Sequence, residues 1–164
     1  MKFFAKSLAV VSALFLLAAC DSTPNSSNGS KSGQGSSMSG NGPHDGSQAD
    51  LTQNVGDRVF FELNESTLSN EAQTTLEHQA AWLKQYPNVN VTVEGHCDER
   101  GTREFNLALG ERRAAAAKKY LVGAGIAANR ISTISYGKER PAVIGSDESA
   151  WSQNRRAVTV LTNQ

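Results

Sequence analysis

Residues 93–101, with the sequence VEGHCDERG, are the most informative part of this 164-residue chain. They end an alternating apolar and polar run and continue into a loop that carries the carboxylate of Asp98 between two glycines. A helix-forming stretch follows, in which Asn106 and Arg113 lie seven positions apart, almost two full turns. Both side chains therefore leave the same face of the expected helix. The pattern predicts a strand, a loop and a helix that bring a carboxylate, an amide and a guanidinium group together.

The other residues on the helix face that carries Asn106 and Arg113 are apolar, as on a helix that packs against a core. Its apolar residues recur at intervals of three and four, and they are Leu109, Ala117, Tyr120 and Leu121. Polar groups beside such a stripe need partners, because leaving a buried group unpaired costs roughly 1–3 kcal/mol. With Asp98 nearby, a ligand with both an ammonium and a carboxylate group would supply these partners. We therefore expect a binding site here and no catalytic site.

The rest of the second half of the chain predicts a small domain with both helices and strands. Alternation and β-branched residues indicate strands at 57–63, 89–93, 131–136 and 156–161. Capping residues and apolar spacing indicate helices at 69–86 and 102–122, and a short helical turn at 150–154. Helices between strands require some parallel pairing. We expect an α/β (α+β) two-layer fold over residues 51–164, with a mixed four-stranded sheet and helices on one face.

The N-terminus has the pattern of a bacterial export signal. Lys2 and Lys6 precede an apolar run at 8–19, which is shorter than the ~20 residues of a membrane-spanning helix. The run ends in Leu-Ala-Ala before Cys20, which resembles the lipobox of bacterial lipoproteins, where the cysteine is acylated. An ordinary signal peptide followed by a stray cysteine is the alternative. We expect a signal peptide at 1–19, lipidation at Cys20, and a protein that is anchored to a membrane by acyl chains.

Residues 20–50 predict a flexible tether between this anchor and the domain. They are rich in Ser, Gly and Asn and contain few apolar residues. Such a segment buries too little apolar surface to offset its ordering entropy. Its mean span would be near ~30 Å. The tether would let an anchored domain reach a target away from the membrane.

Charge and cysteine content exclude some classes of partner. The formal net charge is zero, so no strongly basic surface indicates nucleic-acid binding. If Cys20 is acylated, Cys97 is the only thiol left, and no intramolecular disulfide is expected. Cys97 is then either a packed core residue or an exposed thiol that could cross-link chains.

The residue types of the loop are compatible with two other chemistries. Residues 96–99 (HCDE) contain metal-binding types, but four adjacent residues cannot all turn toward one ion, and no second cluster has zinc spacing. A glycoside hydrolase would use paired carboxylates, for which Glu94, Asp98 and Glu99 are candidates. Glu99 is expected to pair with nearby arginines, and no set of nucleophile, base and orienting residue is visible. We expect no metal, no cofactor and no catalysis.

Several spaced motifs together resemble the OmpA C-terminal-like peptidoglycan-binding domain. The motifs are GHCDERG at 95–101, Asn106, LGERRA at 109–114, SYGKERP at 135–141 and NRRAV at 154–158. The resemblance covers nearly everything from residue 59 to residue 161. With the lipobox and the tether, the architecture is similar to the peptidoglycan-associated lipoprotein family of the Tol-Pal system.

This resemblance implies a ligand and a set of binding residues. It implies that the domain binds the diaminopimelate residue of peptidoglycan stem peptides, with Asp98 and Arg113 on its charged ends. Asn106 is expected to brace the loop, and the backbone of Leu63 and Asn64 is expected to contribute. A guanidinium group suits bidentate capture of a carboxylate, and a carboxylate suits an ammonium group.

The resemblance also implies a place and partners. It implies anchoring in the outer membrane and a role with the Tol proteins in outer-membrane constriction, with TolB meeting the surface at 94–102. Two positions depart from the family pattern, namely Asn64 where Asp is common and Cys97 where Thr or Ala is usual. Separately, Asp21 directly follows Cys20, where Asp signals inner-membrane retention in enteric bacteria, but sorting rules differ among bacteria and the outer membrane remains the expectation. For Arg155 and Arg156, a structural role and a ligand contact both remain open.

Overall fold

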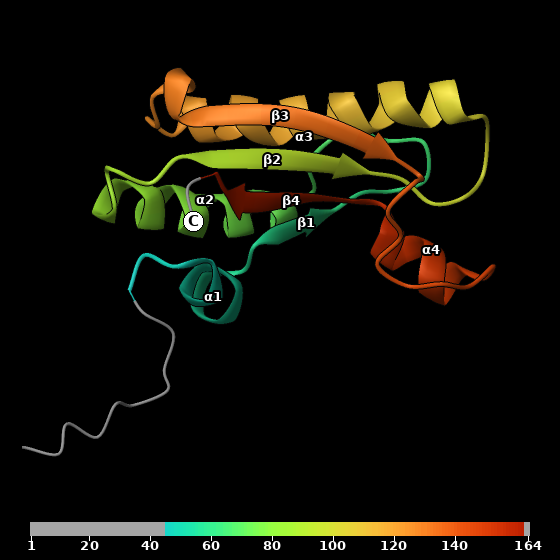
Figure 1. Cartoon of the computed structure of the whole chain (residues 1–164), viewed down its shortest axis with the longest axis horizontal. Helices are drawn as coiled ribbons and strands as arrows, with labels where there is room; N and C mark the ends of the chain where they lie inside the picture. Colours follow the sequence, from blue (N-terminus) through green and yellow to red (C-terminus); the bar gives the residue numbers. More distant parts are fainter. Residues whose placement is uncertain (1–44, 163–164) are drawn as a thin grey trace, which may run out of the picture. The chain divides into compact units, whose positions relative to one another are not determined.

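The computed structural model describes residues 45–162. The expected signal peptide, Cys20 and most of the expected tether lie outside the described residues. Four strands form one sheet (Figure 1), and they are β1 (Arg58–Phe60), β2 (Val91–His96), β3 (Ile131–Gly137) and β4 (Arg156–Leu161). The helical segments are α1 (Gln48–Asp50), the π-helical η1 (Leu51–Val55), α2 (Asn70–Gln85), α3 (Arg103–Gly123), the 3₁₀ segment η2 (Ala128–Arg130) and α4 (Glu148–Asn154).

The sheet is mixed, in the order β1-β4-β2-β3. β2 and β3 pair in parallel and are joined by α3, whereas β4 is antiparallel to both β1 and β2. β4 therefore lies between β1 and β2, although it comes last in the chain. The predicted fold class, with its mixed four-stranded sheet, is confirmed.

Helices α2 and α3 pack against each other and against the sheet on one face (Figure 1). Val91 and Val93 of β2 and Ala157 of β4 point toward this layer and are almost fully buried. They meet Leu76 and Leu83 of α2, as well as Leu121 of α3. Every second residue of β2 is thus apolar and faces the apolar sides of the two helices.

Polar side chains start the helices where the sequence indicates. Ser69 accepts a hydrogen bond from the Ala72 amide at the start of α2, and Thr102 accepts one from the Phe105 amide at the start of α3. Asp147 caps α4 in the same way. Each such cap contributes about 1 kcal/mol. Within residues 45–162, no helix has the length and apolar character needed to cross a membrane.

The folded unit begins before the boundary expected at residue 51. Ser47 caps α1, and the Asp50 carboxylate, which is buried, accepts hydrogen bonds from the Trp82 indole (2.8 Å) and the Asn54 amide (2.8 Å). Hydrogen bonds, with that from Asn54 the strongest influence, lower the pKa of Asp50, although its burial acts in the opposite direction. Residues 45–50 therefore belong to the domain and not to the tether. The polar composition of this segment gave no sign of it, because the contact with Trp82 comes from a helix more than thirty residues later in the chain.

β2 and α3 approach each other closely at two glycines. A Cβ atom on Gly95 would collide with the backbone carbonyl of Gly110, and the closeness is possible only because neither residue has a side chain. Arg113 follows Gly110 by almost one turn, so this close approach sets how its side chain enters the fold.

Candidate functional site

The residues that the sequence singled out lie at one edge of the sheet. β1, β2 and β3 end there and β4 begins there, since the first three run in one direction and β4 runs opposite (Figure 1). The loop at 97–101 follows β2, and the turn at 62–65 follows β1. The start of α3 and the end of α4 border the same edge. Segments from four parts of the chain thus surround one site.

Asp98 is buried in this loop and fully engaged by one neighbour. It is 4 % exposed, and Arg100 donates to both of its oxygens, from Nη2 to Oδ2 (2.6 Å) and from Nε to Oδ1 (3.1 Å). The Arg100 backbone amide adds a third hydrogen bond (3.0 Å), and Arg155 Nη1 lies 3.7 Å from Oδ2. Burial alone would raise the pKa of Asp98, but the hydrogen bonds from Arg100 hold it below its usual value. Asp98 is therefore a carboxylate, suited to a cation and unsuited to act as a general acid.

Arg100 and Arg155 connect Asp98 to a second carboxylate. Glu148 accepts a hydrogen bond from Arg155 Nη2 (2.6 Å), and its other oxygen lies 4.0 Å from Arg100 Nη2. The guanidinium group of Arg100 also stacks on the ring of Trp151, 4.0 Å from its centroid. The four charged groups therefore form a closed ring in which the signs alternate.

Arg113 is the most completely buried side chain of the site, with 0 % exposure. Its guanidinium group donates to three backbone carbonyl oxygens, those of Glu65 (2.8 Å), His96 (2.8 Å) and Glu62 (3.1 Å). Burial lowers the pKa of Arg113. The sequence argument that Arg113 needs a ligand to satisfy it is wrong, because carbonyls of the same chain are its partners.

Two of these carbonyls belong to a tight turn that follows β1. The turn runs from Glu62 to Glu65 and is closed by a hydrogen bond from the Glu65 amide to the Glu62 carbonyl (3.1 Å). Asn64 has a φ of 60°, a left-handed conformation that Asn tolerates better than most residues. Leu63 is 46 % exposed. No hydrogen bond within residues 45–162 engages the backbone amides of Leu63 and Asn64, so both are free to donate to a ligand.

Asn106 connects α3 to the loop. Its amide nitrogen donates to the carbonyls of Arg100 (2.8 Å) and Thr102 (3.1 Å). Cys97 packs beneath it, 3 % exposed, and donates from Sγ to the Asn106 carbonyl (3.3 Å). Burial raises the pKa of the Cys97 thiol. The expectation of a packed cysteine is confirmed, and that of an exposed cross-linking thiol is wrong.

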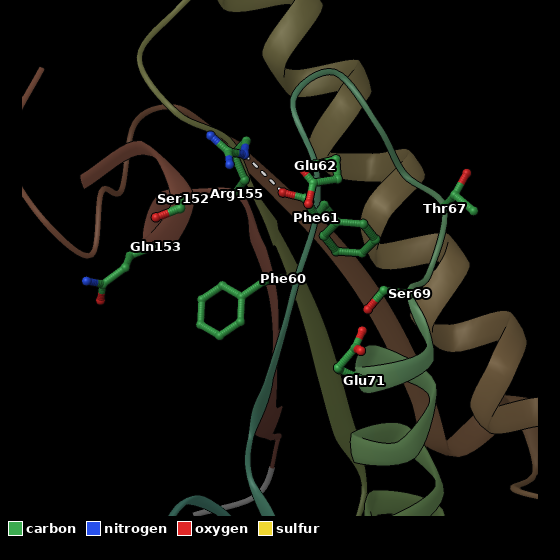
Figure 2. A pocket seen from close by; sticks show the side chains of 9 residues that line it. All are labelled: Phe60, Phe61, Glu62, Thr67, Ser69, Glu71, Ser152, Gln153 and Arg155. Atoms are coloured by element: carbon green, nitrogen blue, oxygen red, sulfur yellow. Dashed lines mark hydrogen bonds between the residues drawn. The ribbon is translucent and has the colours of Figure 1, made fainter. Parts of the chain in front are cut away.

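A pocket of about 460 Å³ adjoins this cluster (Figure 2). It lies beside β1, between the start of α2 and the end of α4, and is lined by Phe60, Phe61, Glu62, Thr67, Ser69, Glu71, Ser152, Gln153 and Arg155. Arg155 both lines the pocket and reaches toward Asp98, while the Glu62 carbonyl accepts from Arg113. The charged cluster and the pocket are therefore continuous.

The two arginines of the last motif have different surroundings. Arg155 lies in the site, where it donates to the Phe61 carbonyl (2.9 Å) and to Glu148. Arg156 points from β4 to the sheet face opposite the helices, and its contacts are with backbone carbonyls of Asn154 (3.4 Å) and Arg140 (3.3 Å). Arg155 is therefore placed where it could contact a ligand, whereas Arg156 lies away from the site.

Sequence reasoning missed Arg100, Trp151 and Glu148. Glu99 was expected to pair with nearby arginines, but it accepts a hydrogen bond from the Trp151 indole instead (3.1 Å). The spacing of Asp98 and Arg100, two residues apart in a loop, was the available signal. Their neighbours on α4 follow about fifty residues later in the chain, and no local pattern connects them.

Comparison with known proteins gives a consistent result. The sequence profile of the OmpA family matches residues 60–155, more than half of the chain. The chain is 61 % identical over 116 residues to a peptidoglycan-associated lipoprotein of Rhizobium meliloti, covering 71 % of this chain and 66 % of that one. It thus spans slightly less than two thirds of that relative. It is 45 % identical over 158 residues to a peptidoglycan-associated lipoprotein of Haemophilus influenzae, covering 96 % of this chain and 98 % of that one.

Solved structures agree with this grouping. The crystal structure of the peptidoglycan-associated lipoprotein from Burkholderia pseudomallei has a TM-score of 0.63 and 38 % identity, covering 65 % of this chain and 90 % of that one. The C-terminal domain of Helicobacter pylori MotB has a TM-score of 0.61 at 22 % identity, covering 66 % and 85 %, and shows the shared fold. On the profile, the near full-length relative and the fold, the chain belongs to the OmpA family and, within it, to the peptidoglycan-associated lipoproteins.

Proposed function

We propose that this chain is a non-enzymatic lipoprotein that binds peptidoglycan non-covalently through the diaminopimelate residue of its stem peptides. The observation that carries this proposal is the ionised carboxylate of Asp98 beside a turn with free backbone amides. Diaminopimelate carries ammonium and carboxylate groups, and each of these charges has a counterpart here. The family to which the chain belongs points to the same polymer.

We propose a different role for each of these residues. Asp98 accepts a charge-assisted hydrogen bond from an ammonium group of the ligand. The amides of Leu63 and Asn64 are donors for a carboxylate, and Arg113 supplies positive charge behind them while it holds their turn in place. Asn106 holds the loop of Asp98. The adjoining pocket offers room for the neighbouring part of the stem peptide.

The setting of this activity follows from the N-terminal sequence. Acylation of Cys20 would anchor the chain in the outer membrane, and residues 20–44 would give the domain reach toward the wall. Such a link between membrane and wall suits a protein that acts with the Tol proteins when the envelope constricts at division. Binding of TolB at the surface of residues 94–102 would then compete with binding of the wall.

A sacculus pull-down tests the proposal. The full-length protein, solubilised in detergent, is incubated with purified sacculi, and the bound fraction is measured against free diaminopimelate as competitor. Replacing Asp98 by Asn should weaken binding by about ten- to hundredfold, because one charge-assisted contact contributes about 1.5–3 kcal/mol. Glu139→Gln removes an exposed carboxylate outside the site and serves as the matched control.

Two results would contradict the proposal. Equal binding of the Asp98→Asn variant and the unaltered protein, with the fold intact, would remove the assigned site. Release of soluble muropeptides from the sacculi would favour the peptidoglycan-hydrolysing alternative over binding alone.

A further inference from the structure

Arg100 occupies the position that a ligand cation would take on Asp98. Its guanidinium group donates to both carboxylate oxygens, at 2.6 and 3.1 Å, which is a bidentate contact. This side chain is 32 % exposed, whereas that of Asp98 is 5 % exposed. Arg100 therefore lies between Asp98 and solvent. An ammonium group cannot make a direct contact with Asp98 unless Arg100 moves.

The structure also contains the position to which Arg100 can move. Its Nη2 atom lies 4.0 Å from Glu148, compared with 2.6 Å from Asp98. Glu148 is 64 % exposed and uses its other oxygen for Arg155. Trp151 lies under the guanidinium plane, so a sideways shift toward Glu148 can keep the cation–π contact. Arg155 remains near Asp98 in either position, at 3.7 Å.

We propose that Arg100 is a displaceable internal cation that determines which ligands the Asp98 site accepts. This inference rests on the proposed function and adds the basis of its selectivity. A ligand group gains access to Asp98 only if it replaces the positive charge that it removes, so an ammonium group is required. A neutral or anionic group would leave the buried Asp98 carboxylate without its bidentate partner. The free energy lost in this way would exceed the free energy gained from the ligand contact.

The ring of charges makes the exchange possible. When an ammonium group binds Asp98, its contact replaces the one between Arg100 and Asp98, while Arg100 keeps its existing pair with Glu148 and moves closer to it. The number of ion pairs is conserved, and no charge is left unpaired. The affinity for the ligand is lowered by whatever free energy Arg100 loses when it leaves Asp98, so removing Arg100 should strengthen binding.

Titration of the full-length protein in detergent with meso-diaminopimelate tests this inference. Arg100→Gln should bind about three- to tenfold more tightly than the unaltered protein, the range expected for a partly exposed ion pair. Arg103→Gln removes the same charge from an exposed residue that pairs with Glu139, and its affinity should stay unchanged. Pimelate, the same dicarboxylate without ammonium groups, should not bind the unaltered protein.

Each outcome separates this inference from the proposed function. If Arg100→Gln binds as well as or less well than the unaltered protein, while Asp98→Asn still loses binding, the role of Arg100 is overturned and the site remains. If the unaltered protein binds neither diaminopimelate nor sacculi, the proposed function fails. As an independent measurement, the NMR signal of the Arg100 Nε–H, hydrogen-bonded to Asp98, should shift at saturation. An unshifted signal would also overturn the inference.

Discussion

Asp98 and Arg113, the two charged residues assigned to one ligand, are held in opposite ways. Arg113 is enclosed by backbone, and its three hydrogen bonds go to carbonyls that no side-chain motion can remove. Asp98 is covered by the long side chain of Arg100, which is partly exposed and has a second partner within 4.0 Å. One end of the site is thus part of the framework, and the other can exchange its partner.

Two residues whose charges both complement the ligand can therefore have different roles in the site. A buried guanidinium group that anchors backbone contributes to the shape of the site as much as to its charge. A carboxylate that is paired with a movable cation contributes chiefly to binding, since its partner can be replaced. Stability should therefore depend mainly on Arg113, and ligand selection mainly on Asp98.

The largest expected effect is on the free energy of unfolding. Arg113→Ala leaves three backbone carbonyls without their donor, the buried one of His96 among them, and opens a cavity, so it should lower this free energy by on the order of 3 kcal/mol or more. Asp98→Asn should lower it by about 1 kcal/mol, because Arg100 and Arg155 both retain Glu148 as a partner. Urea unfolding of the two variants measures the difference. Arg112→Ala, on the exposed neighbour, is the control and should change little.

If Arg113→Ala and Asp98→Asn destabilised the protein equally, the expected difference between the two residues would be contradicted. Asp98 would then be part of the framework, like Arg113.

An intermediate effect is expected from pH. His96 donates no side-chain hydrogen bond within the described residues, is almost fully buried, and provides the carbonyl that Arg113 Nη1 binds. Burial lowers its pKa to about 4, and the nearby charges of Arg156, Arg140 and Arg58 act in the same direction. The carboxylate of Glu94 lies 3.4 Å from Nε2, but the two form an ion pair only when His96 is protonated.

The sign of the pH effect follows from proton uptake. The unfolded chain takes up a proton at His96 near pH 6.5 and the folded chain only near pH 4, so the stability present above pH 6.5 falls as the pH decreases through this window. Between pH 7 and pH 5 the loss should be about 2 kcal/mol. The pKa of Asp98 is lowered, so Asp98 stays ionised and binding should persist while stability falls.

Urea unfolding and sacculus binding at both pH values measure the two effects together. His96→Asn should remove most of this pH dependence, whereas His78→Asn, at an exposed position, should retain it. If binding and stability fell together, the separate roles of Arg113 in stability and Asp98 in binding would be contradicted.

The smallest expected effect concerns the turn that Arg113 holds. Asn64 has a left-handed φ of 60°, so Asn64→Ala should lower the free energy of unfolding by about 1 kcal/mol, and Asn64→Gly should leave it nearly unchanged. Binding should follow the same order, because the contribution comes from the backbone amide. Thermal unfolding and sacculus binding test this, and a loss of binding in Asn64→Gly would instead indicate a role for the Asn64 side chain.

Local sequence patterns predicted the four strands, the helices α2, α3 and α4 and their order, but not α1, η1 or η2. Alternation at 89–93 placed β2, the N-caps Ser69 and Thr102 placed the starts of α2 and α3, and helical connections required parallel pairing. These signals are local, since each depends on residues within one or two turns or a few positions of a strand. The same local motifs also indicated the loop of Asp98 as the place to search for function.

The contacts of the charged residues follow from the three-dimensional arrangement of distant segments. Arg113 binds carbonyls 48 and 51 positions earlier in the chain, and Trp151 meets Glu99 across 52 positions. These pairs exist because β4, the last strand, is inserted between β1 and β2, which brings the ends of distant segments to one edge of the sheet. A shift of about an ångström decides whether a buried cation contacts a ligand, a side chain or the backbone. The spacing of residues along the chain does not specify positions to that precision.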